Sequence, residues 1–271
     1  MYKHFGLQRL TPTIGALVSG IDLCAPLSDK AFAELHAAWM EHLVLFFREQ
    51  ALTPDQHIAL GQRFGELEVH PDAPCAHGIP ELMVIHTDKD SRRNNGENWH
   101  SDVSSREEPP MASILHLTHV PEEGGDTLFA NMYAAYDALS EPMQGLLDQL
   151  TAHHDHHQSL GSWRLQYDVP SADHPVVRVH PVTGKKALFV NAVFTEKIRG
   201  MSWPESDALL QFLFEHIKHP EFHCRFSWQA NSVALWDNRC AQHLAVWDYY
   251  PNSRSGHRVT VKGDRPLPTT P

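Results

Sequence analysis

The sequence predicts an α+β protein rich in strands, with a double-stranded β-helix (jelly roll) core and helices packed outside it. Short apolar or alternating segments outnumber those that a doubly wound α/β fold needs. No Gly-rich phosphate loop joins a strand to a helix. The chain also lacks internal repeats and low-complexity linkers, so we expect one domain over residues 1–271.

The first quarter of the chain predicts two helices around a buried strand. Ser28 is a good N-cap, and apolar residues follow it at helical spacing. Residues 43–47 form a short apolar run that is typical of a buried strand. Thr53 is expected to cap a second helix, which should end at Gly65.

Strands dominate the rest of the chain. Helices are expected between residues 132 and 150, and again behind Ser202, where Pro204 and Glu205 complete a capping box. The predicted strands are residues 82–86, 112–117, 127–130, 176–179, 187–190, 222–228, 232–236 and 257–262.

Composition narrows the function. The formal charge of −11 does not suit a phosphate backbone, so we expect no nucleic-acid partner. The four cysteines are scattered, which predicts neither a disulfide framework nor a thiolate zinc site. No secretory signal and no apolar run of membrane-spanning length is present. We therefore expect a cytoplasmic protein without a membrane partner.

His100 and Asp102 form a His-x-Asp pair, which places an imidazole and a carboxylate on one side of an extended segment. His243, at the end of a late strand, is the candidate third ligand. Two histidines and one carboxylate leave three positions open on a metal, which is typical of non-haem Fe(II) chemistry. Imidazole also suits zinc, and His-x-Asp arises by chance in a chain with 21 histidines.

Arg254 and Arg258 follow His243 and strengthen the metal interpretation. An arginine fork pairs naturally with a carboxylate, such as the far end of a dicarboxylate that chelates iron. Two alternatives remain open at this point. One is a jelly-roll metalloenzyme that does not use 2-oxoglutarate, either a zinc hydrolase or a cupin-type oxygenase. The other is a binding relative without catalytic activity.

The chain resembles the TauD/TfdA family of Fe(II)/2-oxoglutarate-dependent dioxygenases. The resemblance covers nearly the whole length, and several motifs are specific in combination. The matching segments are residues 14–16, 63–67, 99–102, 124–127, 180–181, 184–185, 188–191, 236–239, 243 and 254–258.

The resemblance implies roles for individual residues. It implies that His100, Asp102 and His243 hold Fe(II), which activates O2, and that Thr127 and Arg254 bind 2-oxoglutarate. It also implies that a small anionic organic substrate lies near Arg258 and that the enzyme forms homo-oligomers. The implied substrate-binding residues are His70, Val103, Ser159, Leu160, Phe194 and Arg258.

Departures from the family pattern bear on the substrate. Members that oxidise taurine carry a tyrosine and an asparagine where this chain has Ala73 and Gly96, and an aromatic where it has Leu160. Fewer polar partners weaken the grip on a zwitterion, and smaller side chains leave room for bulk. We therefore expect a sulfonate, sulfate ester or carboxylate other than taurine.

Overall fold

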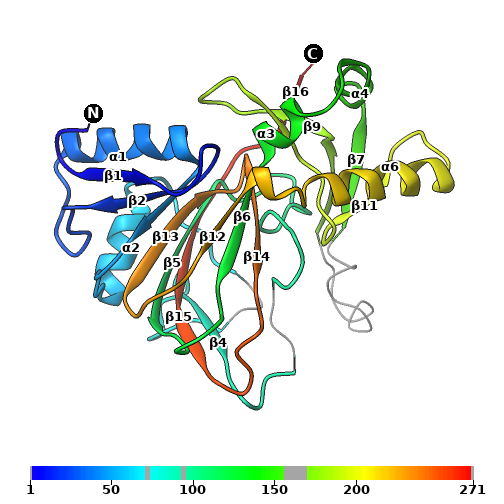
Figure 1. The fold of residues 1–271 in the computed structure, drawn as a ribbon. Helices are drawn as coiled ribbons and strands as arrows, with labels where there is room; N and C mark the ends of the chain where they lie inside the picture. The colour runs from blue at the N-terminus through cyan, green and yellow to red at the C-terminus, as the bar shows by residue number, and fades with distance from the viewer. Residues whose placement is uncertain (1, 71–73, 93–95, 156–169, 270–271) are drawn as a thin grey trace.

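The computed structural model describes residues 2–70, 74–92, 96–155 and 170–269, and its centre is a seven-stranded sheet (Figure 1). The strand order is β1-β2-β3-β13-β5-β15-β4, and all neighbours are antiparallel except β2 and β3. The strands are β1 Gly6–Arg9, β2 Ala16–Ser19, β3 Val44–Phe47, β4 Met83–Thr87, β5 Ala112–His119, β13 Ser232–Asp237 and β15 Arg254–Val261.

Three smaller antiparallel sheets complete the described strands, in the orders β12-β6-β14, β11-β7-β8 and β10-β9-β16. The first is β12 His223–Phe226, β6 Thr127–Asn131 and β14 Ala241–Ala245. The second is β11 Thr195–Ile198, β7 Thr151–Asp155 and β8 Ser171–Pro175. The third is β10 Lys186–Leu188, β9 Val177–Val179 and β16 Leu267–Pro268.

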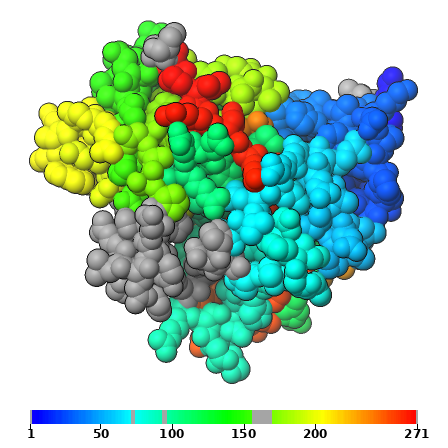
Figure 2. All heavy atoms as spheres, turned by 180° about the vertical axis from the view of Figure 1, so that it is seen from behind, coloured from blue at the N-terminus to red at the C-terminus, as the bar shows by residue number. Residues whose placement is uncertain are grey.

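Helices lie outside the strands. α1 and α6 lie at opposite ends of the molecule, in the view of Figure 1 and from behind in Figure 2. The helices are α1 Asp29–His42, α2 Pro54–Gln62, α3 Met132–Asp137, α4 Glu141–Leu147, α6 Trp203–His216 and the 3-10 turn η2 Pro220–Phe222. Within the described residues, none of the helices has both the length and the apolar character that a membrane span requires.

Both faces of the seven-stranded sheet are buried at its strand β3. Leu45 and Phe47 of β3 join the cluster that contains Leu35 and Trp39 of α1. Phe46, which points to the opposite face, joins the cluster that contains Phe129 of β6. Because both faces of β3 are buried, its sequence is a continuous apolar run. The apolar cluster that contains Phe46 and Phe129 lies between the seven-stranded sheet and the sheet of β6 and β14.

The predicted capping residues are confirmed. Ser28 accepts a hydrogen bond from the Ala31 amide, and Thr53 and Ser202 both start capping boxes. All nine predicted strands exist with shifted ends, although Phe222 belongs to η2 rather than to β12. The strand-rich α+β architecture is also confirmed, whereas the double-stranded β-helix, the single domain and the homo-oligomer stay predictions.

Two expectations about element boundaries were wrong. α2 ends at Gln62 rather than at Gly65, because a single turn follows and Gly65 adopts φ 159°, which is extended backbone. His243 does not end the strand of Trp236, because β13 stops at Asp237 and His243 lies on the separate strand β14.

A buried histidine makes the stability of the fold pH-dependent. Burial lowers the pKa of His57 to about 3, and its Nε2 contacts the Ile114 carbonyl at 3.0 Å. The unfolded chain therefore binds a proton that the folded chain refuses, so stability falls as pH drops from 6.5 toward 3. At pH 5 the loss from this residue is about 2 kcal/mol.

We predict that His57→Gln, whose amide can still bond the Ile114 carbonyl, reduces this pH dependence. Urea unfolding at pH 7.5 and pH 5 measures it. The wild type should lose about 2 kcal/mol more than the variant over this interval. Equal losses in the two proteins would show that His57 does not set the acid sensitivity.

Candidate active site

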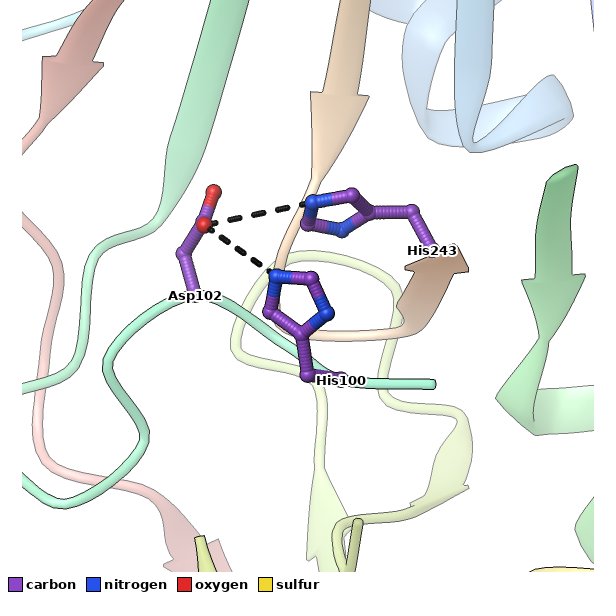
Figure 3. A group of neighbouring side chains, drawn as sticks. All are labelled: His100, Asp102 and His243. Atoms are coloured by element: carbon purple, nitrogen blue, oxygen red, sulfur yellow. Dashed lines mark ion pairs between the residues drawn. The ribbon is translucent and has the colours of Figure 1, made fainter. Parts of the chain in front are cut away.

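Three buried side chains converge at the candidate metal centre (Figure 3). Asp102 Oδ1 lies 3.9 Å from His100 Nε2 and 4.0 Å from His243 Nε2. The three candidate ligand atoms all lie within 4.8 Å of one another. Two imidazoles and one carboxylate on one side of a metal form the donor set that non-haem Fe(II) oxygenases use.

Backbone pairing brings the ligands together. The amide of His100 donates to the His243 carbonyl at 3.1 Å, and the amide of His243 donates back at 2.8 Å. These two residues form an isolated antiparallel bridge, and their ring centroids lie 4.1 Å apart. His-x-Asp geometry then turns Asp102 to the same side as His100.

The tautomer of His100 is suited to a metal. Its Nδ1 lies 2.8 Å from the Asn98 carbonyl, which requires Nδ1 to carry the proton and leaves the Nε2 lone pair toward the site. Burial lowers the pKa of both histidines, so both rings are neutral near pH 7. Burial alone would raise the pKa of Asp102, but Arg258, the histidines and Ser113 together hold it below its ordinary value.

Arg258 lies beside the three candidate ligands. Its Nη1 donates to Asp102 Oδ1 at 2.9 Å, and its Nη2 contacts the Met83 sulfur at 3.6 Å. Its Nε is buried and has no hydrogen-bond partner among the described residues. The guanidinium therefore keeps donor capacity next to the candidate metal centre.

Arg254 is a buried cation that no described carboxylate pairs with. Only 4% of the residue is exposed, and its Nε has no hydrogen-bond partner within the described part of the chain. Its Nη2 reaches Thr127 Oγ1 at 3.3 Å, and its guanidinium lies over the Trp228 ring at 5.4 Å. Burial lowers the pKa of Arg254 to about 10, which leaves it charged at neutral pH.

The Thr127 hydroxyl is aligned by two donors. Both Arg254 Nη2 and Trp228 Nε1, the latter at 3.0 Å, donate to Thr127 Oγ1. Its own proton is therefore directed toward a third group. Thr127 and Phe129 share a face of β6, and Phe129 pairs in register with His243. Thr127 thus lies on the same strand ladder as His243, and Arg254 of β15 reaches it from the facing sheet.

Gly256 lies between the two arginines, where β15 closely approaches β5. A Cβ at this position would lie 2.1 Å from the His116 carbonyl oxygen, so a side chain cannot be accommodated against β5. The register of β15 against β5 shifts between Ser255 and Gly256. Arg254 and Arg258 lie on one face of β15 on either side of this glycine.

The contacts of the other predicted substrate-binding residues do not assign them a role in substrate binding. Val103, directly after Asp102, is buried at φ 40°, an unusual backbone conformation for a β-branched residue that often marks a functional site. Phe194 is buried, and its carbonyl accepts from the Asp155 amide. His70 is half-buried. Ser159 and Leu160 lie outside the described residues. The substrate role of all five stays a prediction.

Among the described residues, two other clusters contain side chains of metal-ligand types, but these side chains contact protein partners. His180 Nδ1 accepts from two backbone amides, so its Nε2 donates to Asp237 at 3.0 Å, and Arg239 binds the same carboxylate. Burial raises the pKa of the nearby Cys240 thiol well above its ordinary value. This buried network is a hydrogen-bonded structural element.

The other cluster lies on β7 and β11. His153 and Asp155 share a face of β7 and approach Glu196, so the three could contact one ion. However, Arg199 Nη2 lies 2.7 Å from His153 Nδ1, and a guanidinium disfavours a cation there.

Sequence reasoning missed the buried polar residues that surround Asp102. Ser113 donates to Asp102 Oδ2 at 2.6 Å, and Asn238 Nδ2 donates to Ser113 Oγ at 3.1 Å. The available signal was a serine inside a predicted buried strand, because a buried hydroxyl needs a hydrogen-bond partner. Trp228, which aligns Thr127, lies in the predicted strand of residues 222–228 but was not identified as a site residue.

A family model described as "Taurine catabolism dioxygenase TauD, TfdA family" matches residues 7–260. Among curated proteins, the chain is similar to the alpha-ketoglutarate-dependent sulfate ester dioxygenase of Pseudomonas putida. The two are 36% identical over 269 residues, which cover 94% of this chain and 88% of that protein. Alpha-ketoglutarate is another name for 2-oxoglutarate.

Two solved structures have the same fold. A taurine dioxygenase from Burkholderia xenovorans is 37% identical, with a TM-score of 0.88 over 98% of this chain and 94% of that one. AAD-2, solved in complex with Mn(II) and N-oxalylglycine, is 30% identical, with a TM-score of 0.85 over 97% of this chain and 99% of that one. N-oxalylglycine differs from 2-oxoglutarate by an N–H in place of a CH2.

We predict that Asp102→Ala weakens binding of a divalent metal by about 100-fold or more, because only two neutral imidazoles remain. Titration of the metal-free protein with Mn(II), followed by electron paramagnetic resonance, measures this. His153→Gln is the matched control and should leave the affinity unchanged. If His153→Gln weakened metal binding more than Asp102→Ala, the metal would instead bind at the cluster of His153, Asp155 and Glu196.

Proposed function

Because this chain belongs to the TauD/TfdA family of 2-oxoglutarate-dependent dioxygenases, we propose that His100, Asp102 and His243 bind Fe(II) and that a small organic anion is the substrate. The reaction converts 2-oxoglutarate, O2 and a substrate C–H to succinate, CO2 and a C–OH. The bound metal supplies the activation of O2. The two facing sheets β3-β13-β5-β15 and β12-β6-β14 would be the halves of a double-stranded β-helix around it.

The buried, carboxylate-free Arg254 is the observation that carries this proposal. A charged guanidinium is costly to bury unless an anion compensates it. Thr127 directs its hydroxyl proton away from Arg254 and Trp228, which adds a donor for the same anion. A zinc hydrolase that does not bind a dicarboxylate gives no reason for this pair.

The spacing of the site also fits 2-oxoglutarate. Thr127 pairs with Ala245, two residues along β14 from His243. Two residues along a strand span about 7 Å, which is comparable to the length of a five-carbon dicarboxylate. The distal carboxylate would bind Arg254 and Thr127, while the keto acid end reaches the metal beside His243.

Arg258 is the candidate anchor of the substrate's anionic group. It lies on the face of β15 that carries Arg254, and its Nη1 already contacts the candidate ligand Asp102. An anion held by its remaining donors would present its neighbouring carbon to the metal, so Arg258 would select which C–H is oxidised. If that carbon bears a sulfate or sulfonate, the hydroxylated product collapses to an aldehyde and releases sulfate or sulfite.

Gly96 supports a substrate other than taurine. Its φ is 103°, which disfavours a side chain, and a Cβ there would lie 3.3 Å from His100 Cε1. The wall of the site beside the His100 ring is therefore formed without a side chain at position 96. Position 96 therefore offers no polar side chain to a substrate amine, which fits a substrate without one.

We predict that the iron-loaded enzyme turns over an alkyl sulfate, a larger sulfonate or an aryloxy acid with kcat/KM at least about tenfold above taurine, the difference that about 1.4 kcal/mol gives. Succinate formation across such a panel, with sulfate or sulfite release, measures this. Efficient taurine turnover at low KM would refute the substrate class, although not the dioxygenase activity.

Separate substitutions should divide the two arginines by role. Arg254→Ala should raise the KM for 2-oxoglutarate by about 30-fold or more, because a hydrogen-bonded charge pair is lost, and should leave the KM for the prime substrate nearly unchanged. Arg258→Ala should do the reverse, measured at saturating Fe(II) because Arg258 contacts Asp102. Equal effects of both substitutions on both ligands would contradict the assignment.

A further inference from the structure

We infer that Ser113, aligned by Asn238 and Trp236, is a positioning residue that holds Asp102 as a metal ligand through one oxygen. The inference rests on the proposed function, because it concerns how many metal positions stay open for 2-oxoglutarate and O2. It assigns a task to three buried residues, none of which is a candidate ligand.

The two oxygens of Asp102 lie in different environments. Oδ1 is the atom that lies 3.9 Å from His100 Nε2 and 4.0 Å from His243 Nε2, and it also accepts from Nη1 of the less deeply buried Arg258 at 2.9 Å. Oδ2 accepts a short hydrogen bond of 2.6 Å from Ser113 Oγ. A short bond to a charged oxygen is among the stronger hydrogen bonds in proteins, so it competes with a metal for Oδ2.

The direction of the Ser113 proton follows from its neighbours. Trp236 Nε1 can only donate, and it donates to Asn238 Oδ1 at 2.9 Å. The amide of Asn238 is therefore oriented with Nδ2 toward Ser113 Oγ, to which it donates at 3.1 Å. Ser113 accepts from Asn238, so its own proton goes to Asp102 Oδ2.

The seven-stranded sheet fixes this chain of hydrogen bonds from Trp236 through Asn238 and Ser113 to Asp102. Ser113 of β5 and Trp236 of β13 are direct cross-strand partners, and the backbone N–H of Asn238 donates to the Met111 carbonyl at 2.9 Å. The backbone carbonyl of Asn238 also accepts from Ser101 Oγ at 2.6 Å, which ties Asn238 to the segment that carries Asp102. At most 3% of Ser113, Trp236, Asn238 or Asp102 is exposed, so water does not replace these bonds.

The binding mode of Asp102 determines how many coordination positions of the metal stay open. With two histidines and one carboxylate oxygen, a six-coordinate metal keeps three positions open, two for a chelating keto acid and one for O2. A carboxylate that bound through both oxygens would occupy one of these. By engaging Oδ2, Ser113 keeps the third position available.

Ser113→Ala tests this directly, because it removes the hydroxyl with little change in volume. With Co(II) as the metal probe, we expect a changed visible absorption spectrum before any 2-oxoglutarate is added. We also expect the Kd of 2-oxoglutarate for the Co(II) protein to rise about 10- to 100-fold, the usual effect of losing a partner behind a metal ligand. Ser113→Thr, which retains the hydroxyl, should restore much of both properties.

Ser232→Ala is the matched control. Ser232 is equally buried and lies at the other end of β13, where it bonds Arg48 rather than Asp102. If Ser113→Ala and Ser232→Ala have the same spectrum and the same Kd, the inference is overturned. If the wild-type Co(II) protein does not bind 2-oxoglutarate at all, the proposed function fails instead, and the spectrum before 2-oxoglutarate still tests Ser113.

Discussion

The pair of backbone hydrogen bonds between His100 and His243 is the interaction on which the candidate site depends. It fastens the segment of His100 to β14, which in turn pairs with β6 over the core. Together with the hydrogen bond from Ser101 to the Asn238 carbonyl, it fixes the His-x-Asp segment relative to the third ligand. A local contact between two main chains thus converts residues far apart in the sequence into one donor set.

Charge balance is the second constraint. The site gathers one buried carboxylate, two neutral histidines and two arginines, and only one of those arginines pairs with the carboxylate. The other, Arg254, is compensated by the Trp228 face and the Thr127 hydroxyl, which are weaker partners than an anion. The protein therefore carries in its fold a preference for an anionic ligand, as its family requires.

The sequence predicted those parts of the site that are local or that the family resemblance supplied. His100 and Asp102 followed from their spacing, and Arg254 from its place after His243. Ser113 and Asn238 could not be predicted, because they meet Asp102 only through the cross-strand register of β5 and β13. The strands β7, β8 and β11 were missed for a related reason: they are short, rich in polar residues, and stabilised by pairing with one another.

An anaerobic visible spectrum of the Fe(II) protein, recorded before and after addition of 2-oxoglutarate, tests the central claim most directly. A new charge-transfer band that saturates with one 2-oxoglutarate per iron is predicted, because the keto acid should chelate the metal held by His100, Asp102 and His243. The band should shift when the right organic anion is added. No band in fully iron-loaded protein would contradict the account.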